Sequence, residues 1–241
     1  TFAVDVTGWD TSNVIDMSNT FDSIDTGVSF VGVSGWNVSS VQTFERTFSG
    51  TSISFDLSSW NPAAATNMDY MFSQYRGSTT ADLTGWDTSN VTTMQSMFYG
   101  SLATFNPDIS TWNTSSVTNM YGMFRYNAVF NQDISSWDTS SVTNVSYMFD
   151  GASAFSYDVS QWCVSNVVSS SSVFRDATSY AHDSPKWGWC WPTIYPGPSG
   201  NRLAILVGRP DGQKTPDSFG YQVASNFGVT LYIDGELKRT L

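Results

Sequence analysis

The chain has 241 residues, of which 40% are hydrophobic and only 13% are charged, and its formal net charge is −11 at pH 7. Fifteen acidic but only three basic residues precede Arg175, and such a balance argues against binding to nucleic acids or anionic membranes, which needs clustered Lys and Arg. No run of about 18 apolar residues is present, so we expect no membrane-inserted segment.

Tryptophan recurs along the chain at intervals of 24 to 27 residues, at Trp9, Trp36, Trp60, Trp86, Trp112, Trp137, Trp162 and Trp187. Other residues keep the same register around the first seven of these tryptophans: an aliphatic residue three before each Trp, Val or Ala five after it, and Phe twelve after it. A typical unit, residues 113–137, reads NTSSVTNMYGMFRYNAVFNQDISSW. A fixed period over so many residues predicts a stack of repeated units.

Each unit is expected to hold one extended piece, one tight turn and one short helix or turn. The F-x-x-D-I-S-S-W segment favours an extended piece, and Val, Met, Met and Phe at spacings of three and four favour a helical face. One unit buries too few apolar residues to fold alone. The expected fold is therefore a repeat solenoid with coils of about 25 residues, whose core rows include Trp86, Trp112, Trp137, Trp162, Phe98, Phe124, Phe149 and Phe174.

Three regions are expected along the chain. Residues 1–191 would form the solenoid of about seven to eight coils, residues 192–200 a Pro/Gly linker, and residues 201–241 the start of a β-rich domain. The alternating runs on either side of Asp234-Gly235 predict a β-hairpin. Because Thr1-Phe2 matches the middle of a unit, we expect the chain to be part of a longer polypeptide.

The two cysteines occupy nearly equivalent places one unit apart, since Cys163 follows Trp162 and Cys190 follows Trp187 by three residues. Neighbouring coils lie about 4.8 Å apart, which a disulfide can span. The alternatives are two buried free thiols, or a zinc site that includes His182, the single histidine. A disulfide would indicate an oxidising, extracellular setting.

Aspartate stands four residues before most of the tryptophans, so stacking would place these carboxylates in one row. Like charges at this spacing repel, so the row must be solvated, hydrogen-bonded to backbone N–H groups or neutralised by cations. Calcium is the cation that suits such oxygen ligands. The candidate ligands are Asp82, Asp108, Asp133 and Asp158. No other cofactor is expected.

Aspartate or asparagine also follows most tryptophans directly and predicts an Asx turn there. Four asparagines lie in N-x-S/T sequons and could carry glycans in a eukaryotic secretory pathway: Asn37, Asn90, Asn113 and Asn144. The tryptophan row itself has two interpretations, a packed core row or, if exposed, a platform for stacking sugars.

The motifs WDTSNVTTMQSMF, FNPDISTW and WNTSSVTNMYGMF resemble the BspA-like surface-protein repeats, which are distant relatives of leucine-rich repeats. The resemblance covers residues 2–187. It implies a leucine-rich-repeat-like solenoid that is secreted or displayed on a cell or virion surface, and it carries over no catalytic residue.

A catalytic site is not expected, since the chain has one His, no G-x-S-x-G and no phosphate-binding glycine loop. The sequence favours a non-enzymatic scaffold that recognises or adheres to a cell-surface protein or carbohydrate. The alternative is a structural subunit of a fibre or appendage that associates with itself. Binding of a soluble ligand would distinguish a recognition scaffold from a fibre subunit.

Overall fold

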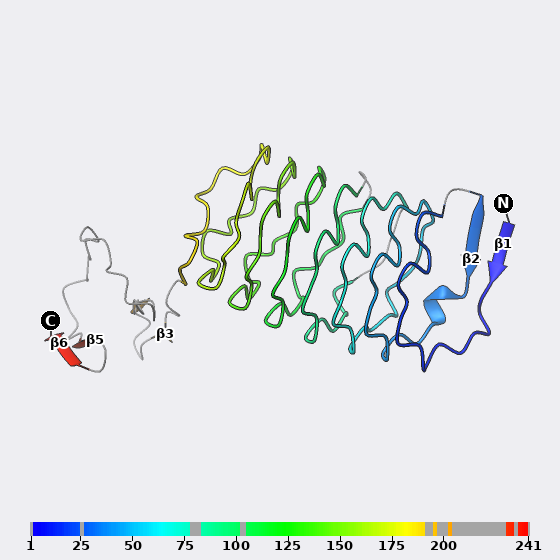
Figure 1. The fold of residues 1–241 in the computed structure, drawn as a ribbon, viewed down its shortest axis with the longest axis horizontal. Coiled ribbons are helices and arrows are strands. Elements are labelled where there is room, and N and C mark those ends of the chain that lie inside the picture. The colour runs from blue at the N-terminus through cyan, green and yellow to red at the C-terminus, as the bar shows by residue number, and fades with distance from the viewer. Residues whose placement is uncertain are drawn as a thin grey trace. The chain divides into compact units, whose positions relative to one another are not determined.

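The computed structural model of the chain describes residues 2–24, 27–77, 83–101, 105–190, 195–196, 202–203, 230–233 and 236–240. The chain divides into two compact units, Thr1–Ala204 and Ile205–Leu241. In the first unit, successive turns of the chain lie side by side (Figure 1). We call each repeat that contains one of the tryptophans from Trp9 to Trp162 a coil, counted from about seven residues before that tryptophan, and the set of coils the stack.

Parallel pairing joins each coil to the next. In the first two coils, strand β1 (Phe2–Asp5) pairs with β2 (Val28–Val31), and a 3-10 helix, η1 (Val33–Gly35), follows β2. Single parallel bridges continue the pairing at the residue seven positions after each tryptophan. They join Asp16, Thr43, Asn67, Thr93, Asn119, Asn144 and Ser169 in that order.

One side of the stack is held by four columns of backbone hydrogen bonds. The N–H groups at 8, 10, 12 and 14 residues after a tryptophan donate to carbonyl groups of the next coil. For example, Met94 donates to Asn119 at 3.0 Å and Ser96 to Tyr121 at 2.8 Å. Every second peptide group thus points along the stack, and the columns replace the hydrogen bonds that a helix would make within one coil.

This pairing requires left-handed backbone conformations at two positions of each coil. The residues 10 and 14 positions after each tryptophan from Trp9 to Trp162 have φ between 50° and 73°. Several are not glycine, such as Ser96, Tyr126 and Tyr147, although the left-handed region disfavours a side chain. The segment that the Val-Met-Met-Phe spacing indicated as a short helix or turn consequently forms turns.

The core consists of aromatic and aliphatic rows that run along the stack. Six successive pairs of phenylalanines, from Phe21 to Phe174, stack with ring centroids 5.4 to 5.7 Å apart. Phe98, Phe124 and Phe149 are fully buried, and Phe174 is partly buried in the last coil.

The indoles from Trp36 to Trp162 are buried as well. Each of these indoles donates from Nε1 to a carbonyl oxygen of the preceding coil, as Trp112 does to Leu83 at 3.0 Å. These six rings are core residues and present no platform for a sugar, whereas Trp9, in the first coil, is 62% exposed.

Short antiparallel pairs follow the stack in sequence. Strand β3 (Tyr195–Pro196) pairs with β4 (Arg202–Leu203), and β5 (Thr230–Ile233) pairs with β6 (Glu236–Thr240). The β5–β6 pair agrees with the predicted hairpin, although its turn at Asp234-Gly235 lies outside the described residues. Most of the predicted linker, residues 192–200, also lies outside them. No helix in the described part of the chain has the length and apolar character that crossing a membrane requires.

Candidate binding face

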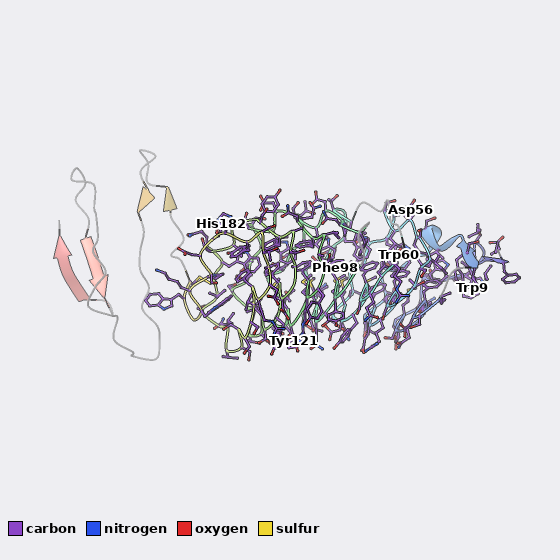
Figure 2. All side chains as sticks on the ribbon, turned by 90° about the horizontal axis from the view of Figure 1, so that it is seen from above. Trp9, Asp56, Trp60, Phe98, Tyr121 and His182 are labelled. Atoms are coloured by element: carbon purple, nitrogen blue, oxygen red, sulfur yellow. A yellow bond between two sulfur atoms is a disulfide. The ribbon has the colours of Figure 1, made fainter. Side chains whose placement is uncertain are left out.

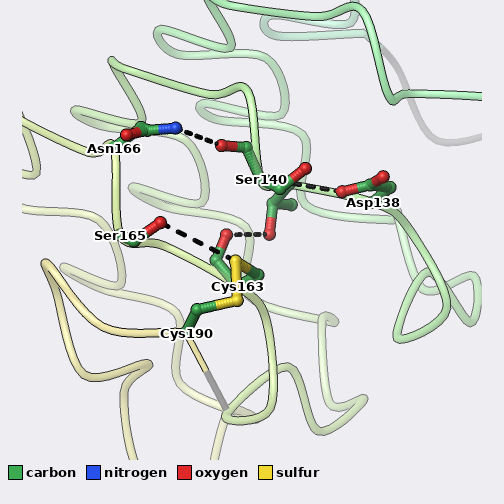
Figure 3. Close-up of a disulfide and its surroundings, with 7 residues drawn as sticks. Asp138, Ser140, Cys163, Ser165, Asn166 and Cys190 are labelled. Carbon is green, nitrogen blue, oxygen red and sulfur yellow. Dashed lines mark hydrogen bonds between the residues drawn. A yellow bond between two sulfur atoms is a disulfide. The ribbon is translucent and has the colours of Figure 1, made fainter. Parts of the chain in front are cut away.

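The two cysteines form a disulfide that joins the last coil to the segment that follows it (Figure 3). Cys163 and Cys190 are bonded, with a sequence separation of 27 and 4.0 Å between their Cα atoms. The backbone pairs here too, because Val164 donates to Trp189 and Gly188 donates to Val164. The predicted disulfide is confirmed, and the free-thiol and zinc alternatives are wrong because neither sulfur remains free.

Most of the described aspartates four residues before the tryptophans cap their own turns. The Oδ1 of Asp108, of Asp133 and of Asp158 accepts the N–H of the serine two residues later, at 2.9 to 3.0 Å. Hydrogen bonds from Ser160 lower the pKa of Asp158 below its ordinary value of 3.8. Asp82, the fourth calcium candidate, lies outside the described residues. Among the described residues, no three His, Cys, Asp or Glu side chains are grouped as a metal site.

Two further Asx turns occur in most coils. The predicted turn after the tryptophan is present at Asp10, Asn37, Asp87, Asn113 and Asp138. Asn61 is the exception, because its Oδ1 accepts the N–H of Asp87 in the next coil. A third turn, at the bridge residue, was not predicted and occurs at Asp16, Asn67, Asn119 and Asn144. Because the side-chain oxygens of these aspartates and asparagines accept hydrogen bonds from backbone N–H groups, the repetition of the residues has a structural cause.

The sequon asparagines differ in their surroundings. Asn37, Asn90 and Asn113 are exposed, while Asn144 is half-buried at a bridge position. The amide nitrogen of Asn90 donates to the carbonyl oxygen of Ala63 at 2.9 Å. Asn37 and Asn113 each accept a hydrogen bond from the hydroxyl of the sequon serine.

The side of the stack with the left-handed turns carries a set of aromatic and basic side chains. Figure 2 shows Tyr121 on one side of the stack, while Asp56 and His182 lie on the other. We call this set the Tyr/Arg face, and it consists of Arg46, Tyr70, Arg76, Tyr99, Tyr121, Arg125, Tyr126, Tyr147 and Arg175.

Ring and guanidinium contacts connect the members of the Tyr/Arg face. The guanidinium of Arg125 lies over the rings of Tyr126 and Tyr147, 4.7 Å from each centroid. The Tyr147 ring meets that of Tyr121 edge to face at 5.6 Å, and the Tyr126 ring meets that of Tyr99 in the same way at 5.8 Å. Arg over an aromatic ring is a favourable contact, so these contacts hold the side chains in place without burying the whole of their rings.

A separate contact of the same kind lies nearer the N-terminus. The guanidinium of Arg46 is 4.8 Å from the centroid of the Tyr70 ring, and the side-chain amide of Gln95 donates to the Tyr70 hydroxyl. Asp69 lies beside Tyr70 in sequence and accepts hydrogen bonds from Thr93 and Gln95. Burial raises the pKa of Asp69 despite these two bonds.

A buried carboxylate fixes the two arginines at the C-terminal end of the face. The Asp150 side chain has no exposed surface and accepts hydrogen bonds from Arg125 at 2.9 Å and from Arg175 at 2.6 Å. These bonds raise the pKa of Arg175, so its charge persists at any physiological pH. Arg125 also donates to the hydroxyl of Tyr126 at 3.0 Å. The orientation of Tyr126 therefore depends on Asp150 in the next coil.

An open pocket of about 350 Å³ lies beside this cluster, lined by Gln74, Arg76, Tyr99, Gly100 and Tyr126. Glycine at position 151 lets Tyr126 lie close to the next coil, since a Cβ there would be 2.5 Å from the Tyr126 Cδ1. Arg76 is exposed, and none of the ion pairs within the described residues includes it. This pocket thus combines two partly exposed aromatic rings with an arginine that forms no ion pair with an acidic side chain of the described residues.

The period alone did not predict the Tyr/Arg face, because the side chains at its positions differ from coil to coil. One signal was present in the sequence. The only basic residues before Arg175 are Arg46, Arg76 and Arg125, and all three fall 10 to 16 residues after a tryptophan. They therefore share one side of an otherwise acidic stack.

Comparison with known proteins gives a family and no function. No curated protein and no solved structure matches the chain. The sequence model of one family, described as "Mycoplasma protein of unknown function, DUF285", matches residues 1–79 and 72–187, which is more than half of the chain, and the chain therefore belongs to this family.

Proposed function

We propose that this chain is a non-enzymatic recognition scaffold that works outside the cell or on its surface, and that the Tyr/Arg face binds a cell-surface glycan or protein. The observation that carries the proposal is the gathering of five tyrosines and four arginines on one side of an acidic stack. Tyr and Arg are the residues most enriched at binding surfaces, because both combine a flat apolar area with hydrogen-bonding groups.

The proposal includes a BspA-like, leucine-rich-repeat-like solenoid for the stacked coils. The coil-to-coil hydrogen bonds and the continuous aromatic rows support it. The Cys163–Cys190 disulfide supports an extracellular location, since such bonds persist in oxidising surroundings. A solenoid also suits recognition because its side chains vary on one face while the backbone beneath them stays the same.

Binding of the full chain to intact cells and to an array of glycans tests this function. A double variant, Tyr121→Ser with Tyr147→Ser, should weaken binding because it removes two aromatic rings from the face. The variant should fold, since Ser171 and Ser172 already occupy the same positions in the last coil. A matched change on the other side of the stack, Ser110→Ala with Ser135→Ala, should leave binding unchanged. Equal loss in both variants, or no binding to any cell or glycan, contradicts the proposal.

A fibre subunit remains the alternative function. The first coil exposes large apolar side chains, with Phe2, Trp9 and Ile15 between 58% and 70% exposed. Exposed apolar side chains of this kind favour contact with another coil, whether of the same polypeptide or of a second copy. Light scattering over a range of protein concentrations separates the two functions, because a fibre subunit should grow in mass and should bind no soluble ligand.

A further inference from the structure

Three regions of the described chain lie outside the structural core and carry unusual chemistry: the exposed first coil, the Asp150 cluster and the pocket lined by Arg76. Nothing in the described structure identifies the partner that would cover the exposed apolar side chains of the first coil. The arginines around Asp150 are already paired. The pocket is the region where a charged group and aromatic rings face solvent together, so it indicates the chemistry of a ligand.

We propose that the pocket lined by Gln74, Arg76, Tyr99, Gly100 and Tyr126 binds a carboxylate-bearing sugar, such as a uronic or sialic acid unit of a glycan. This inference rests on the proposed function and specifies the ligand class of the same face. The three requirements of such a unit are a cation for the carboxylate, a flat apolar surface for the sugar ring and hydrogen-bonding groups for its hydroxyls.

Arg76 supplies the cation. A guanidinium matches a carboxylate with two parallel hydrogen bonds, and a bond between two charged groups is about twice as strong as one between neutral groups. Arg125 and Arg175 direct their guanidinium groups to Asp150, at 2.9 and 2.6 Å, so they are less available. The net charge of −11 opposes the approach of an anion, but solvent ions screen this repulsion beyond about 8 Å.

Tyr99 and Tyr126 supply the apolar surface. Their rings meet edge to face at 5.8 Å, and Tyr126 is 45% exposed. The guanidinium of Arg125 covers the Tyr126 ring at 4.7 Å, and Arg125 also donates to the Tyr126 hydroxyl. Both contacts fix the ring before a ligand arrives, which lowers the entropic cost of binding.

Gln74 and Gly100 complete the pocket. Gln74 is exposed and offers an amide that can donate to and accept from sugar hydroxyls. Gly100 occupies the same position in its coil as Gln74 and Tyr126 do in theirs, and all three have φ between 51° and 59°. The missing side chain at Gly100 leaves the space between Gln74 and Tyr126 open.

Binding of the full chain to polygalacturonate, measured by calorimetry, tests the inference, and the methyl ester of the same polymer is the ligand control because it keeps the ring and loses the charge. Sialyllactose and lactose form a second pair that separates sialic acid from uronic acid. The acidic member of at least one pair should bind at least about tenfold more tightly than its neutral partner.

Three variants locate the site. Arg76→Gln should weaken binding to the acid at least about tenfold. Gly100→Gln should also weaken it, because the added side chain enters the pocket, while Gln74 shows that the left-handed turn accepts glutamine. Lys186→Gln removes one positive charge from an exposed position outside the Tyr/Arg face, so it should change affinity by less than about twofold. Unchanged melting temperatures would show that each variant is folded.

Several results would overturn the inference. They are equal binding of the acid and its ester, no effect of Arg76→Gln, or an equal loss with Lys186→Gln, which would indicate attraction to any polyanion. Binding to neutral glycans or to cells that survives Arg76→Gln would overturn the inference and leave the proposed function standing. Absence of binding to all glycans and cells would remove both.

Discussion

The carboxylate of Asp150 accepts hydrogen bonds of 2.8 and 2.6 Å from the guanidinium of Arg175, which lies 25 residues later and one coil away. The same carboxylate accepts a bond of 2.9 Å from Arg125, one coil earlier. One buried anion therefore links three consecutive coils. A charge without exposed surface is tolerated only when it is paired, so the three side chains depend on one another.

Replacement of Asp150 by asparagine should lower the free energy of unfolding by about 3 kcal/mol, because it leaves two cations beside a buried neutral group. Urea unfolding followed by circular dichroism measures the change. Asp176→Asn is the control, since the Asp176 side chain is 79% exposed and 3.9 Å from Arg175, and exposed pairs contribute below about 1 kcal/mol. Equal unfolding midpoints for the two variants would show that the Asp150 cluster does not stabilise the stack.

Phe124 tests the aromatic core. Its ring stacks between those of Phe98 and Phe149 at 5.6 and 5.5 Å and is fully buried. Phe124→Ala should cost about 3–5 kcal/mol, because the neighbours on both sides prevent the coil from closing the cavity. Tyr157→Ala, at a side chain that is 39% exposed, should cost below about 1 kcal/mol. A loss at Phe124 no larger than that at Tyr157 would argue against a rigid phenylalanine row.

The positions of the buried rings and of the disulfide could be predicted because they recur with the period. Phe124 and Trp112 keep one register through the chain, and a constant register in a stack means constant burial. Cys163 and Cys190 were predictable for the same reason, since they lie in equivalent places of adjacent coils. The role of the carboxylate row could not be predicted, because the spacing of Asp108 and Asp133 suits both the capping of a turn and the binding of a cation.

The backbone of the turns could not be predicted from side-chain spacing. Met94, Met97 and Phe98 lie at helical spacing, but the N–H groups of Met94 and Phe98 donate to the next coil at 3.0 and 2.9 Å. Hydrogen bonds between coils thus replace the hydrogen bonds within a helix, and the sequence of a single unit does not show which of the two sets forms. The Tyr/Arg face could not be predicted from the period either, since Tyr126 and Arg76 do not recur at the equivalent positions of other coils.

Acid should destabilise the stack through the exposed turn aspartates. Hydrogen bonds from the hydroxyl and the backbone N–H of Ser12 lower the pKa of Asp10 below 3.8, and those from Ser89 do the same for Asp87. A lowered pKa in the folded state contributes stability above the unfolded pKa, and this contribution is lost as pH falls through the folded pKa. The melting temperature should therefore fall as pH decreases below about 4.

Asn37 and Asn113 already occupy the same place in other coils, which provides the control for the acid experiment. A double variant, Asp10→Asn with Asp87→Asn, keeps both turns and should show a shallower fall of melting temperature with pH. Asp69 acts in the opposite sense, because burial raises its pKa, and it is present in both proteins. A pH profile that the double variant leaves unchanged would assign acid sensitivity to other groups.

Calcium should not change the stability of the chain. The Oδ1 atoms of Asp108, Asp133 and Asp158 already accept backbone hydrogen bonds of 2.9 to 3.0 Å, and a cation would compete for these oxygens. Thermal melting with chelator and with millimolar calcium measures the effect, and magnesium controls for ionic strength. A rise in melting temperature with calcium alone, abolished by Asp108→Asn with Asp133→Asn, would show that the row binds the cation.

The disulfide should stabilise the last coil and leave the earlier coils unaffected. Cys163–Cys190 closes a loop with a sequence separation of 27, for which the chain-entropy account gives about 3.5 kcal/mol. Cys163→Ser with Cys190→Ser should therefore expose the amides of residues 163–190 to hydrogen exchange, while those around Phe98 keep their protection. The backbone bonds of Val164 remain in the variant, so the coil should loosen and not detach. Loss of protection along the whole stack would mean that the coils unfold as one cooperative unit and that the disulfide stabilises all of them.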